Sequence, residues 1–173
     1  SQEMDLLIEE LAERRLLAEL ISANQFLSDL DLKKLCMNLT SNADSIASLL
    51  LSRLKEEYGP SEVELIAMGK WGGRELGLRS DLDFVFVVPG EPTANDQKVA
   101  KRFLARMTEP HRGGSIYAID MRLRPSGQAG PILVSAPRTG RCSSSGTAPP
   151  WRGSDGMWSR ASSSTTRRTS SVP

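Results

Sequence analysis

The chain has 173 residues, of which 39% are hydrophobic and 25% charged, and its formal net charge is +1. This composition is typical of a globular chain, and no apolar run reaches the roughly 18 residues that a transmembrane helix requires. The acidic start of the sequence lacks the basic and then apolar order of a secretory signal. Two cysteines, Cys36 and Cys142, are too few for a disulfide framework or a zinc site, so we expect a cytoplasmic protein without a membrane partner.

The charge is unevenly distributed along the chain. Residues 137–173 carry six arginines and one aspartate, whereas residues 1–136 carry 16 basic and 20 acidic side chains. Because nucleic-acid binders present a basic surface, the acidic main part of the chain predicts no nucleic-acid partner.

Residues 1–60 show the apolar spacing of helices. We predict one amphipathic helix over 4–21, a second that begins near Ser28 or Asp29, and a third from about 43 to 58 that stops before Gly59-Pro60. Leucine stripes at this spacing usually form core, so these helices are expected to pack rather than to catalyse. The apolar residues at helical spacing are Leu6, Leu7, Leu11, Leu17, Leu20 and Ile21 in the first helix, Leu32, Leu35, Cys36 and Leu39 in the second, and Ile46, Leu49, Leu50 and Leu54 in the third.

From residue 61 the pattern changes to short apolar runs with glycine and proline between them. We predict strands over 63–68, 82–88 and 115–123, a short helix within 73–78, and a helix over 95–108 with Val99, Phe103, Leu104 and Met107 facing inward. Strands alternating with helices predict an α+β or α/β core, with a short mixed sheet and flanking helices, over residues 61–136 behind the helical leader.

The composition changes again at residue 137. Residues 137–173 contain ten serines, six arginines and five threonines, and no leucine, isoleucine or phenylalanine. Such a segment cannot bury enough apolar surface to offset its ordering entropy, so we expect it to be disordered. The same residue usage is typical of a GC-rich gene read in the wrong frame. A frameshift near codon 136 is our hypothesis, and a genuine disordered linker is the alternative.

Asp81 and Asp83 form an acid pair at the start of the second predicted strand. Successive strand residues point to opposite faces, so these two carboxylates project the same way and Leu82 the other way. Paired carboxylates repel each other unless a cation lies between them, and such oxygen ligands suit Mg²⁺. The pair therefore predicts a metal site, with a solvated strand end as the alternative.

Two further features extend this pair. Gly69, Gly72 and Gly73 form a turn whose backbone N–H groups can approach a phosphate. Asp120 lies on the third predicted strand and offers a third carboxylate to the same cluster. Two metal ions held by such carboxylates can stabilise the attacking and leaving oxygens of an in-line displacement.

Taken in this order, the glycine turn, the S-D-x-D pair and the later aspartate resemble the nucleotidyltransferase superfamily of DNA polymerase beta. The likeness is closer for one family. Residues 68–76 and 80–83 resemble the G-x-G-K-L-G-G-x-E-L and S-D-x-D-L signature of glutamine synthetase adenylyltransferases, although Trp71 stands where leucine is usual. Residues 119–127 resemble the same family's V-D-x-R-L-R-P-x-G block, so the match covers about residues 43–136.

The resemblance implies a Mg²⁺-dependent enzyme, with Mn²⁺ as the alternative ion, that moves AMP between ATP and a tyrosine of glutamine synthetase. That family has two such domains, one adding AMP and one removing it by phosphorolysis, and responds to the PII signalling protein. This chain resembles one domain, a fragment, and its direction is left open. The implied metal-binding and catalytic residues are Asp81, Asp83 and Asp120, and the implied nucleotide-binding residues are Gly72, Gly73, Ser80, Arg122, Arg124 and Lys70.

Several of these residues have a structural alternative. The Ser80 hydroxyl can serve the turn alone, Arg122 can pair with a carboxylate of the cluster, and Lys70 can be a solvated loop residue. We interpret Glu75 as structural, and His111 as a loop residue with a catalytic base as the alternative. For the whole chain, the alternatives are a non-catalytic nucleotide-binding remnant and a stand-alone small-molecule nucleotidyltransferase.

Overall fold

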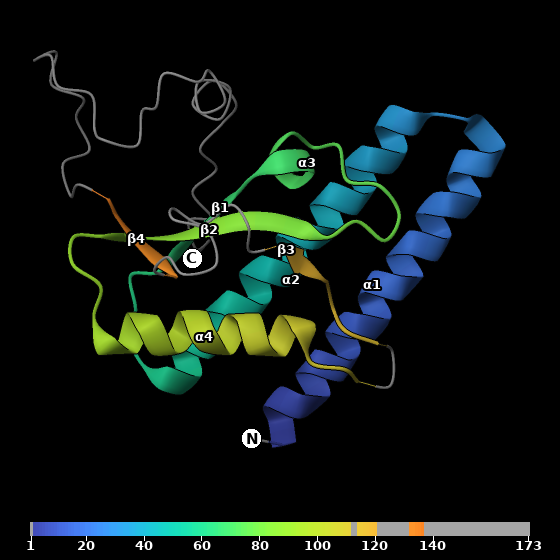
Figure 1. The fold of residues 1–173 in the computed structure, drawn as a ribbon. Coiled ribbons are helices and arrows are strands. Elements are labelled where there is room, and N and C mark those ends of the chain that lie inside the picture. Colours follow the sequence, from blue (N-terminus) through green and yellow to red (C-terminus); the bar gives the residue numbers. More distant parts are fainter. Residues whose placement is uncertain (1, 112–113, 121–131, 137–173) are drawn as a thin grey trace, which may run out of the picture.

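A computed structural model describes residues 2–111, 114–120 and 132–136 (Figure 1). Two long helices come first and a small mixed sheet with one further long helix follows, which confirms the predicted mixed α and β architecture. The elements in chain order are α1 (Gln2–Asp29), α2 (Leu32–Tyr58), β1 (Glu64–Ala67), α3 (Gly69–Gly72), β2 (Leu82–Pro89), α4 (Ala94–Thr108), β3 (Ile119–Asp120) and β4 (Leu133–Ala136).

β2 is the central strand of the sheet. It pairs antiparallel with β1, with Ile66 opposite Val85, and parallel with both β3 and β4. β3 meets the first residues of β2 and β4 meets the last four, so β2 is held along its whole length. The sheet thus places the start of β2 beside Asp120, which decides the geometry of the site.

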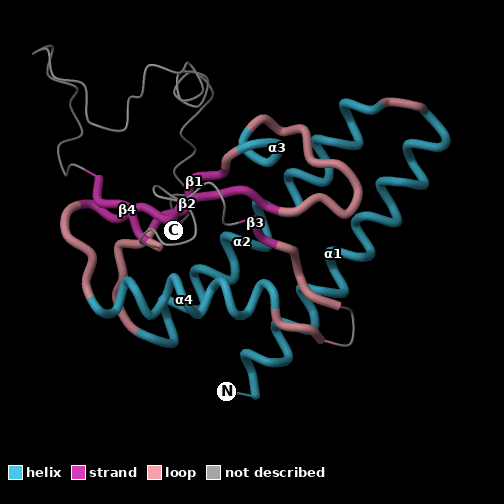
Figure 2. The backbone as a smooth tube through the Cα atoms, viewed as in Figure 1, coloured by secondary structure: helices cyan, strands magenta, loops and turns pink. Residues whose placement is uncertain are grey.

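Helices α2 and α4 lie along one face of the sheet, as the backbone trace shows (Figure 2). Phe84 and Phe86 of β2 reach this layer and meet Phe103 of α4. The three rings pack edge-to-face in pairs, with centroids 5.1 to 5.8 Å apart. Such pairs add to the free energy gained by burying the rings. The predicted inward residues Val99, Phe103 and Met107 are buried and Leu104 is half-buried, as expected for this helix.

The second and third predicted helices are wrong as separate elements, because α2 is continuous from Leu32 to Tyr58. Thr40 in the supposed gap is buried, and packing therefore carries the helix through a stretch of low propensity. The N-cap is Asp31, whose carboxylate accepts from the Lys34 N–H at 3.0 Å, and neither Ser28 nor Asp29 takes that place. The predicted end before Gly59 is confirmed.

The structure confirms the predicted helix at α1, but a different side of that helix is buried. The buried residues are Met4, Ile8, Leu11, Ala12 and Ser22, so of the six predicted apolar positions Leu11 is buried and Leu7 is half-buried. The helix is also longer than predicted, from Gln2 to Asp29. It carries apolar side chains on both sides, and the sequence could not show which side meets α2. The four predicted residues that are exposed are Leu6, Leu17, Leu20 and Ile21.

Two smaller predictions also need correction. The short helix of the glycine turn is Gly69–Gly72 rather than a segment within 73–78. Of the third predicted strand, residues 115–118 lie outside any strand, because the Tyr117 N–H donates to the Met107 carbonyl of α4 and not to a neighbouring strand. Residues 121–123 lie outside the described residues.

A buried carboxylate joins the helical leader to the core. Asp96, 4% exposed, accepts hydrogen bonds from the Ser61 hydroxyl, the Glu62 N–H and the N-cap residue Thr93. Burial alone would raise the pKa of Asp96, but the hydrogen bonds from Thr93 and Ser61 outweigh it and the pKa is lowered. The link between α2 and β1 is therefore fixed to the start of α4.

The predicted boundaries at residues 60 and 136 remain predictions, and the disorder and frameshift predictions for 137–173 lie outside the described residues. Within the described part of the chain, no helix has the length and apolar character needed to cross a bilayer.

Candidate active site

Three carboxylates meet at the start of β2. The parallel register places Asp83 directly beside Asp120, and Asp81 lies two residues before Asp83 on the same side. One carboxylate oxygen from each residue lies within 4.8 Å of the other two. The structure thus brings together the three acids that the sequence predicted as one cluster.

All three acids can reach solvent, whereas their neighbour Leu82 is fully buried. Carboxylates this close repel each other when ionised, and a divalent cation between them removes that cost. Three converging oxygen ligands, with partial access to solvent for further ligands, fit Mg²⁺ or Mn²⁺. The donor set therefore suits the implied metal, and its role as a metal site remains our prediction.

The glycine turn lies directly against this cluster. Gly69 has φ of +51°, a region that favours glycine, and a Cβ added there would overlap the Oδ2 atom of Asp83. A Cβ at Gly72 would come within 2.6 Å of the Ala67 carbonyl oxygen. These two glycines allow the turn to approach both β1 and the Asp83 carboxylate.

The predicted phosphate contacts of Gly72 and Gly73 remain predictions. Their N–H groups donate within the turn, to the Met68 carbonyl at 2.8 Å and to the Gly69 carbonyl at 3.0 Å. Gly73 has an ordinary φ of −78°, and a Cβ added to it would lie 3.3 Å from the Gly69 carbonyl oxygen. Gly69 is the glycine whose conformation and position require that residue type, although the family resemblance implied only Gly72 and Gly73 as nucleotide-binding residues.

Trp71 anchors the turn to the rest of the fold. Its side chain is 3% exposed, and its indole N–H donates to the Asp44 carboxylate of α2 at 2.9 Å. Its ring meets Phe84 edge-to-face, with centroids 5.8 Å apart. An aromatic residue within a glycine turn indicates that the turn packs against the core. The sequence could not show that its partner is Asp44, 27 residues away.

The loop between the turn and β2 is closed by Ser80. The hydroxyl oxygen of Ser80 accepts from the Gly77 N–H at 3.1 Å, which is the structural alternative considered for this residue. Arg79, with φ of +56°, donates its backbone N–H to the Glu19 carboxylate of α1 at 3.2 Å. Glu19 also pairs with Arg15 at 2.7 Å, so α1 helps to hold the loop that leads into Asp81.

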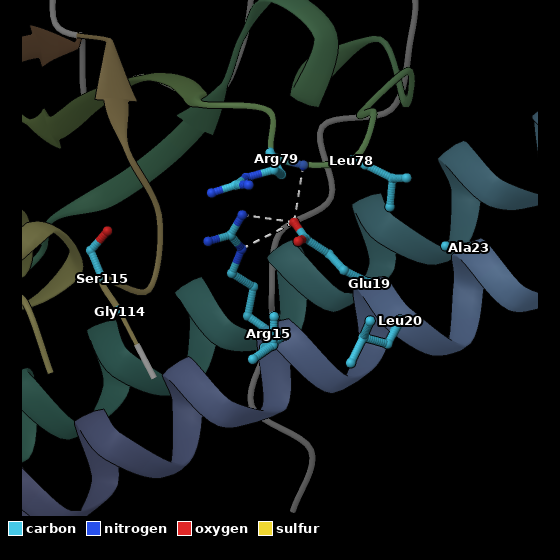
Figure 3. Close-up of a pocket in the computed structure, with 9 residues that line it drawn as sticks. Arg15, Glu19, Leu20, Ala23, Leu78, Arg79, Gly114 and Ser115 are labelled. Atoms are coloured by element: carbon cyan, nitrogen blue, oxygen red, sulfur yellow. Dashed lines mark hydrogen bonds and ion pairs between the residues drawn. The ribbon is translucent and has the colours of Figure 1, made fainter. Parts of the chain in front are cut away.

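A shallow pocket lies where α1 faces this loop (Figure 3). Arg15, Glu19 and Leu20 line it from the helix, and Leu78 and Arg79 line it from the loop. None of the three clustered acids lines this pocket, so it is distinct from the carboxylate cluster.

Some of the remaining predicted residues belong to the part of the chain that the structure describes, and two do not. Lys70 is exposed on α3, near the cluster in sequence, and Glu75 donates its backbone N–H to the Lys70 carbonyl at 2.7 Å. His111 forms a backbone bridge with Gly114, which agrees with its interpretation as a loop residue. Arg122 and Arg124 lie outside the described residues, so their predicted nucleotide contacts remain predictions.

Comparison with known protein families matches residues 7–139 to glutamate-ammonia ligase adenylyltransferase. The chain belongs to this family. The match includes the glycine turn, the acid pair and Asp120, and it therefore supports the resemblance drawn from those motifs. It also includes most of α1 and all of α2, so the helical leader is part of what the family shares.

Curated relatives of the glutamate-ammonia ligase adenylyltransferase family agree with this match. A bifunctional glutamine synthetase adenylyltransferase/adenylyl-removing enzyme from Chromobacterium violaceum is 36% identical over 86 residues, which cover 44% of this chain and 10% of that protein. The enzymes of the same name from Shewanella loihica and Burkholderia mallei are 29% and 33% identical, over 64% and 51% of this chain and 14% and 12% of theirs. The chain thus spans about a tenth of the length of these relatives.

Proposed function

We propose that this chain carries a nucleotidyltransferase domain that moves AMP between ATP and a tyrosine of glutamine synthetase. The observation that carries the proposal is the cluster of Asp81, Asp83 and Asp120 in a chain of this family. The names of the relatives supply the protein substrate. The cytoplasm is the proposed location.

Asp81, Asp83 and Asp120 would hold Mg²⁺ or Mn²⁺. When bound, such an ion neutralises charge on the phosphate oxygens and favours the in-line displacement. The carboxylates would set the position of the ion, because β2 and β3 fix Asp83 and Asp120 side by side. Gly69 keeps the space next to Asp83 free of a side chain, so the turn residues Lys70, Gly72 and Gly73 are proposed to face the triphosphate.

Adenylylation in this proposal forms one phosphorus–oxygen bond and breaks another. The tyrosine hydroxyl oxygen attacks the α-phosphorus of ATP, its proton passes to Asp120, and pyrophosphate leaves. Removal uses inorganic phosphate as the attacking group on the same phosphorus, which releases the tyrosine and gives ADP. Arg122 and Arg124 are proposed to bind the phosphate oxygens, and regulation by the PII protein is proposed from the family resemblance.

Two incubations test the reaction and its direction. The chain with Mg²⁺, ATP labelled in the α-phosphate and glutamine synthetase should transfer label to the synthetase, or the chain with phosphate and adenylylated synthetase should release labelled ADP. A synthetase whose target tyrosine is replaced by phenylalanine is the control for the acceptor. Label in that control would contradict the assignment of the acceptor.

Asp83→Asn tests the proposed site, because it removes a charge with little change in shape. We expect it to abolish Mg²⁺-dependent turnover while the far-ultraviolet circular dichroism stays unchanged. Activity equal to the wild type would overturn the proposed site. ATP binding by equilibrium dialysis without turnover would instead identify a non-catalytic nucleotide-binding remnant.

A further inference from the structure

One carboxylate oxygen of α1 is shared between the helix and the loop that follows the glycine turn. The Glu19 Oε1 atom accepts from Arg15 Nε at 3.1 Å, from Arg15 Nη2 at 2.7 Å and from the Arg79 backbone N–H at 3.2 Å (Figure 3). The side chains of Arg15 and Glu19 are 18% and 12% exposed, so water competes less for these hydrogen bonds than at a fully exposed ion pair. Glu19 is therefore a fixed acceptor on the helix.

The hydrogen bond from Arg79 bears on Asp81, which lies two residues further along the chain. Arg79 has φ of +56°, a left-handed conformation that a residue with a Cβ keeps only where surrounding contacts hold it. Its N–H donates to Glu19, which lies 60 residues earlier in the sequence. Loss of this acceptor would let Arg79 return to a negative φ, and the direction in which the chain enters Asp81 would change.

Arg15 connects the same carboxylate to the segment that leads into Asp120. Its guanidinium lies over the Tyr117 ring, 4.9 Å from the ring centroid. Tyr117 is 5% exposed, and its backbone N–H donates to the Met107 carbonyl of α4. The chain reaches Asp120 three residues after Tyr117, so the contact with Arg15 helps to fix the start of this segment.

The two segments meet at one backbone hydrogen bond beside the carboxylate cluster. The Leu82 N–H donates to the Ala118 carbonyl at 2.9 Å, directly before the register pair of Asp83 and Asp120. One turn of α1 therefore contacts both of the segments that deliver the acids. The close approach of the three acids, within 4.8 Å, depends on how these segments are set against each other.

We propose that Glu19 is a positioning residue for the carboxylate cluster. It acts through the Arg79 backbone on one side and through Arg15 on the other, and it thereby sets the distance between Asp81 and Asp120. The inference rests on the proposed metal site. Helix α1 would then contribute to the metal affinity of the site as well as to the core.

Two substitutions of similar length separate the acceptor from the charge. Glu19→Met removes the acceptor, whereas Glu19→Gln keeps an oxygen that can accept from the Arg79 N–H, and both new residues favour helix. Calorimetric titration of the full chain with Mg²⁺ should show about tenfold weaker binding for Glu19→Met, the lower end of the loss when a partner that orients metal ligands is removed. Glu19→Gln should recover most of the affinity, because a neutral amide oxygen is a weaker acceptor in the same place.

The ion pair of Arg53 and Glu56 on α2 offers a matched control. It is also an arginine–glutamate pair within one helical turn, at 3.0 Å, and its side chains are 49% and 62% exposed. Glu56→Met should leave the Mg²⁺ affinity unchanged. Equal weakening in Glu56→Met and Glu19→Met would overturn the proposal, and so would a wild-type affinity in Glu19→Met.

Amide hydrogen exchange without metal makes the test independent of the proposed function. Followed by NMR, the Arg79 and Leu82 amides should both exchange about tenfold faster in Glu19→Met, since a hydrogen bond to a charged group is lost. A role confined to the loop would change Arg79 alone. If the wild type binds no Mg²⁺, the proposed metal site fails, and exchange at Leu82 still decides whether Glu19 sets the two segments.

Arg15→Met provides a second variant in case Glu19→Met does not fold, which circular dichroism shows. It removes the contact with Tyr117 and should also speed exchange at Leu82. Exchange at Leu82 that stays at the wild-type rate in a folded variant overturns the positioning role.

Discussion

Along β2, the side chains from Leu82 to Val88 that point toward the helices are buried, whereas those from Asp83 to Val87 on the opposite face remain partly exposed. One face carries the aromatic contacts of the core, and the other carries a carboxylate of the candidate site. The two faces are built from alternate residues of the same eight-residue strand. The comparison shows that a site can be fixed rigidly by residues that take no part in it, since packing of Phe84 holds the backbone from which Asp83 projects.

The largest expected effect is on the buried face. Phe84→Ala should lower the free energy of unfolding by about 3 to 5 kcal/mol, because it leaves a cavity beside Trp71, Phe86 and Phe103. Val85→Ala on the opposite face should cost only about 1 kcal/mol. Urea unfolding followed by circular dichroism measures both. Equal costs at the two positions would contradict the assignment of the faces.

Metal binding should stabilise the protein through the partly exposed face of β2 alone. Mg²⁺ at about 100 times its Kd should raise the free energy of unfolding by about 2.7 kcal/mol, because it binds the folded carboxylate cluster and not the unfolded chain. Asp81→Asn should abolish most of this gain, whereas Glu62→Gln, an exposed acid beside β1, should leave it unchanged. Thermal unfolding with and without Mg²⁺ measures the difference. The same gain in Asp81→Asn would place metal binding elsewhere.

The glycine turn joins the two faces, and Gly69 tests that contact. Gly69→Ala should cost about 1 to 2 kcal/mol of stability, because φ at this position is +51° and alanine disfavours that region. It should also weaken Mg²⁺ binding, because the added Cβ displaces the Asp83 carboxylate.

Gly73→Ala is the control for this change, since Gly73 has an ordinary φ of −78°. Calorimetric titration with Mg²⁺ compares the two variants. An unchanged affinity in Gly69→Ala would show that the approach of the turn to Asp83 has no role in metal binding.

The smallest effect at neutral pH concerns Tyr117, on the helix side of the sheet. Burial raises the pKa of Tyr117 from 10.0 to about 12, although a hydrogen bond with Asn42 and the nearby Arg15 act in the opposite direction. Because the unfolded chain ionises at lower pH than the folded one, stability should be constant at neutral pH and fall as the pH rises from about 10 toward 12.

A Tyr58→Phe variant isolates this titration, because the sequence has two tyrosines. Absorbance near the phenolate band should then rise only close to pH 12 in the folded protein. Ionisation at an ordinary pH of about 10 would show that Tyr117 is not buried against α1 and α2.

The sequence predicted the candidate site better than it predicted the helices. Asp81 and Asp83 share a face because strand alternation is a local rule, and the structure confirms the placement. The limits of α4 and the end of α2 also depend on nearby residues, because the Thr93 cap and the Gly59 stop lie next to them in the chain. The join between the second and third predicted helices could not be predicted locally, because burial of Thr40 overrode its weak helix propensity.

By itself, the sequence determined the motifs: a glycine turn, an acid pair on one strand face, and the family to which these belong. The tertiary structure decided which residues meet. The parallel register of β2 and β3 brings Asp120 to Asp83, the Trp71 indole finds Asp44, and α2 selects one of the two apolar sides of α1. Alternation and capping act over a few residues, whereas register and helix facing depend on packing between segments far apart in the chain.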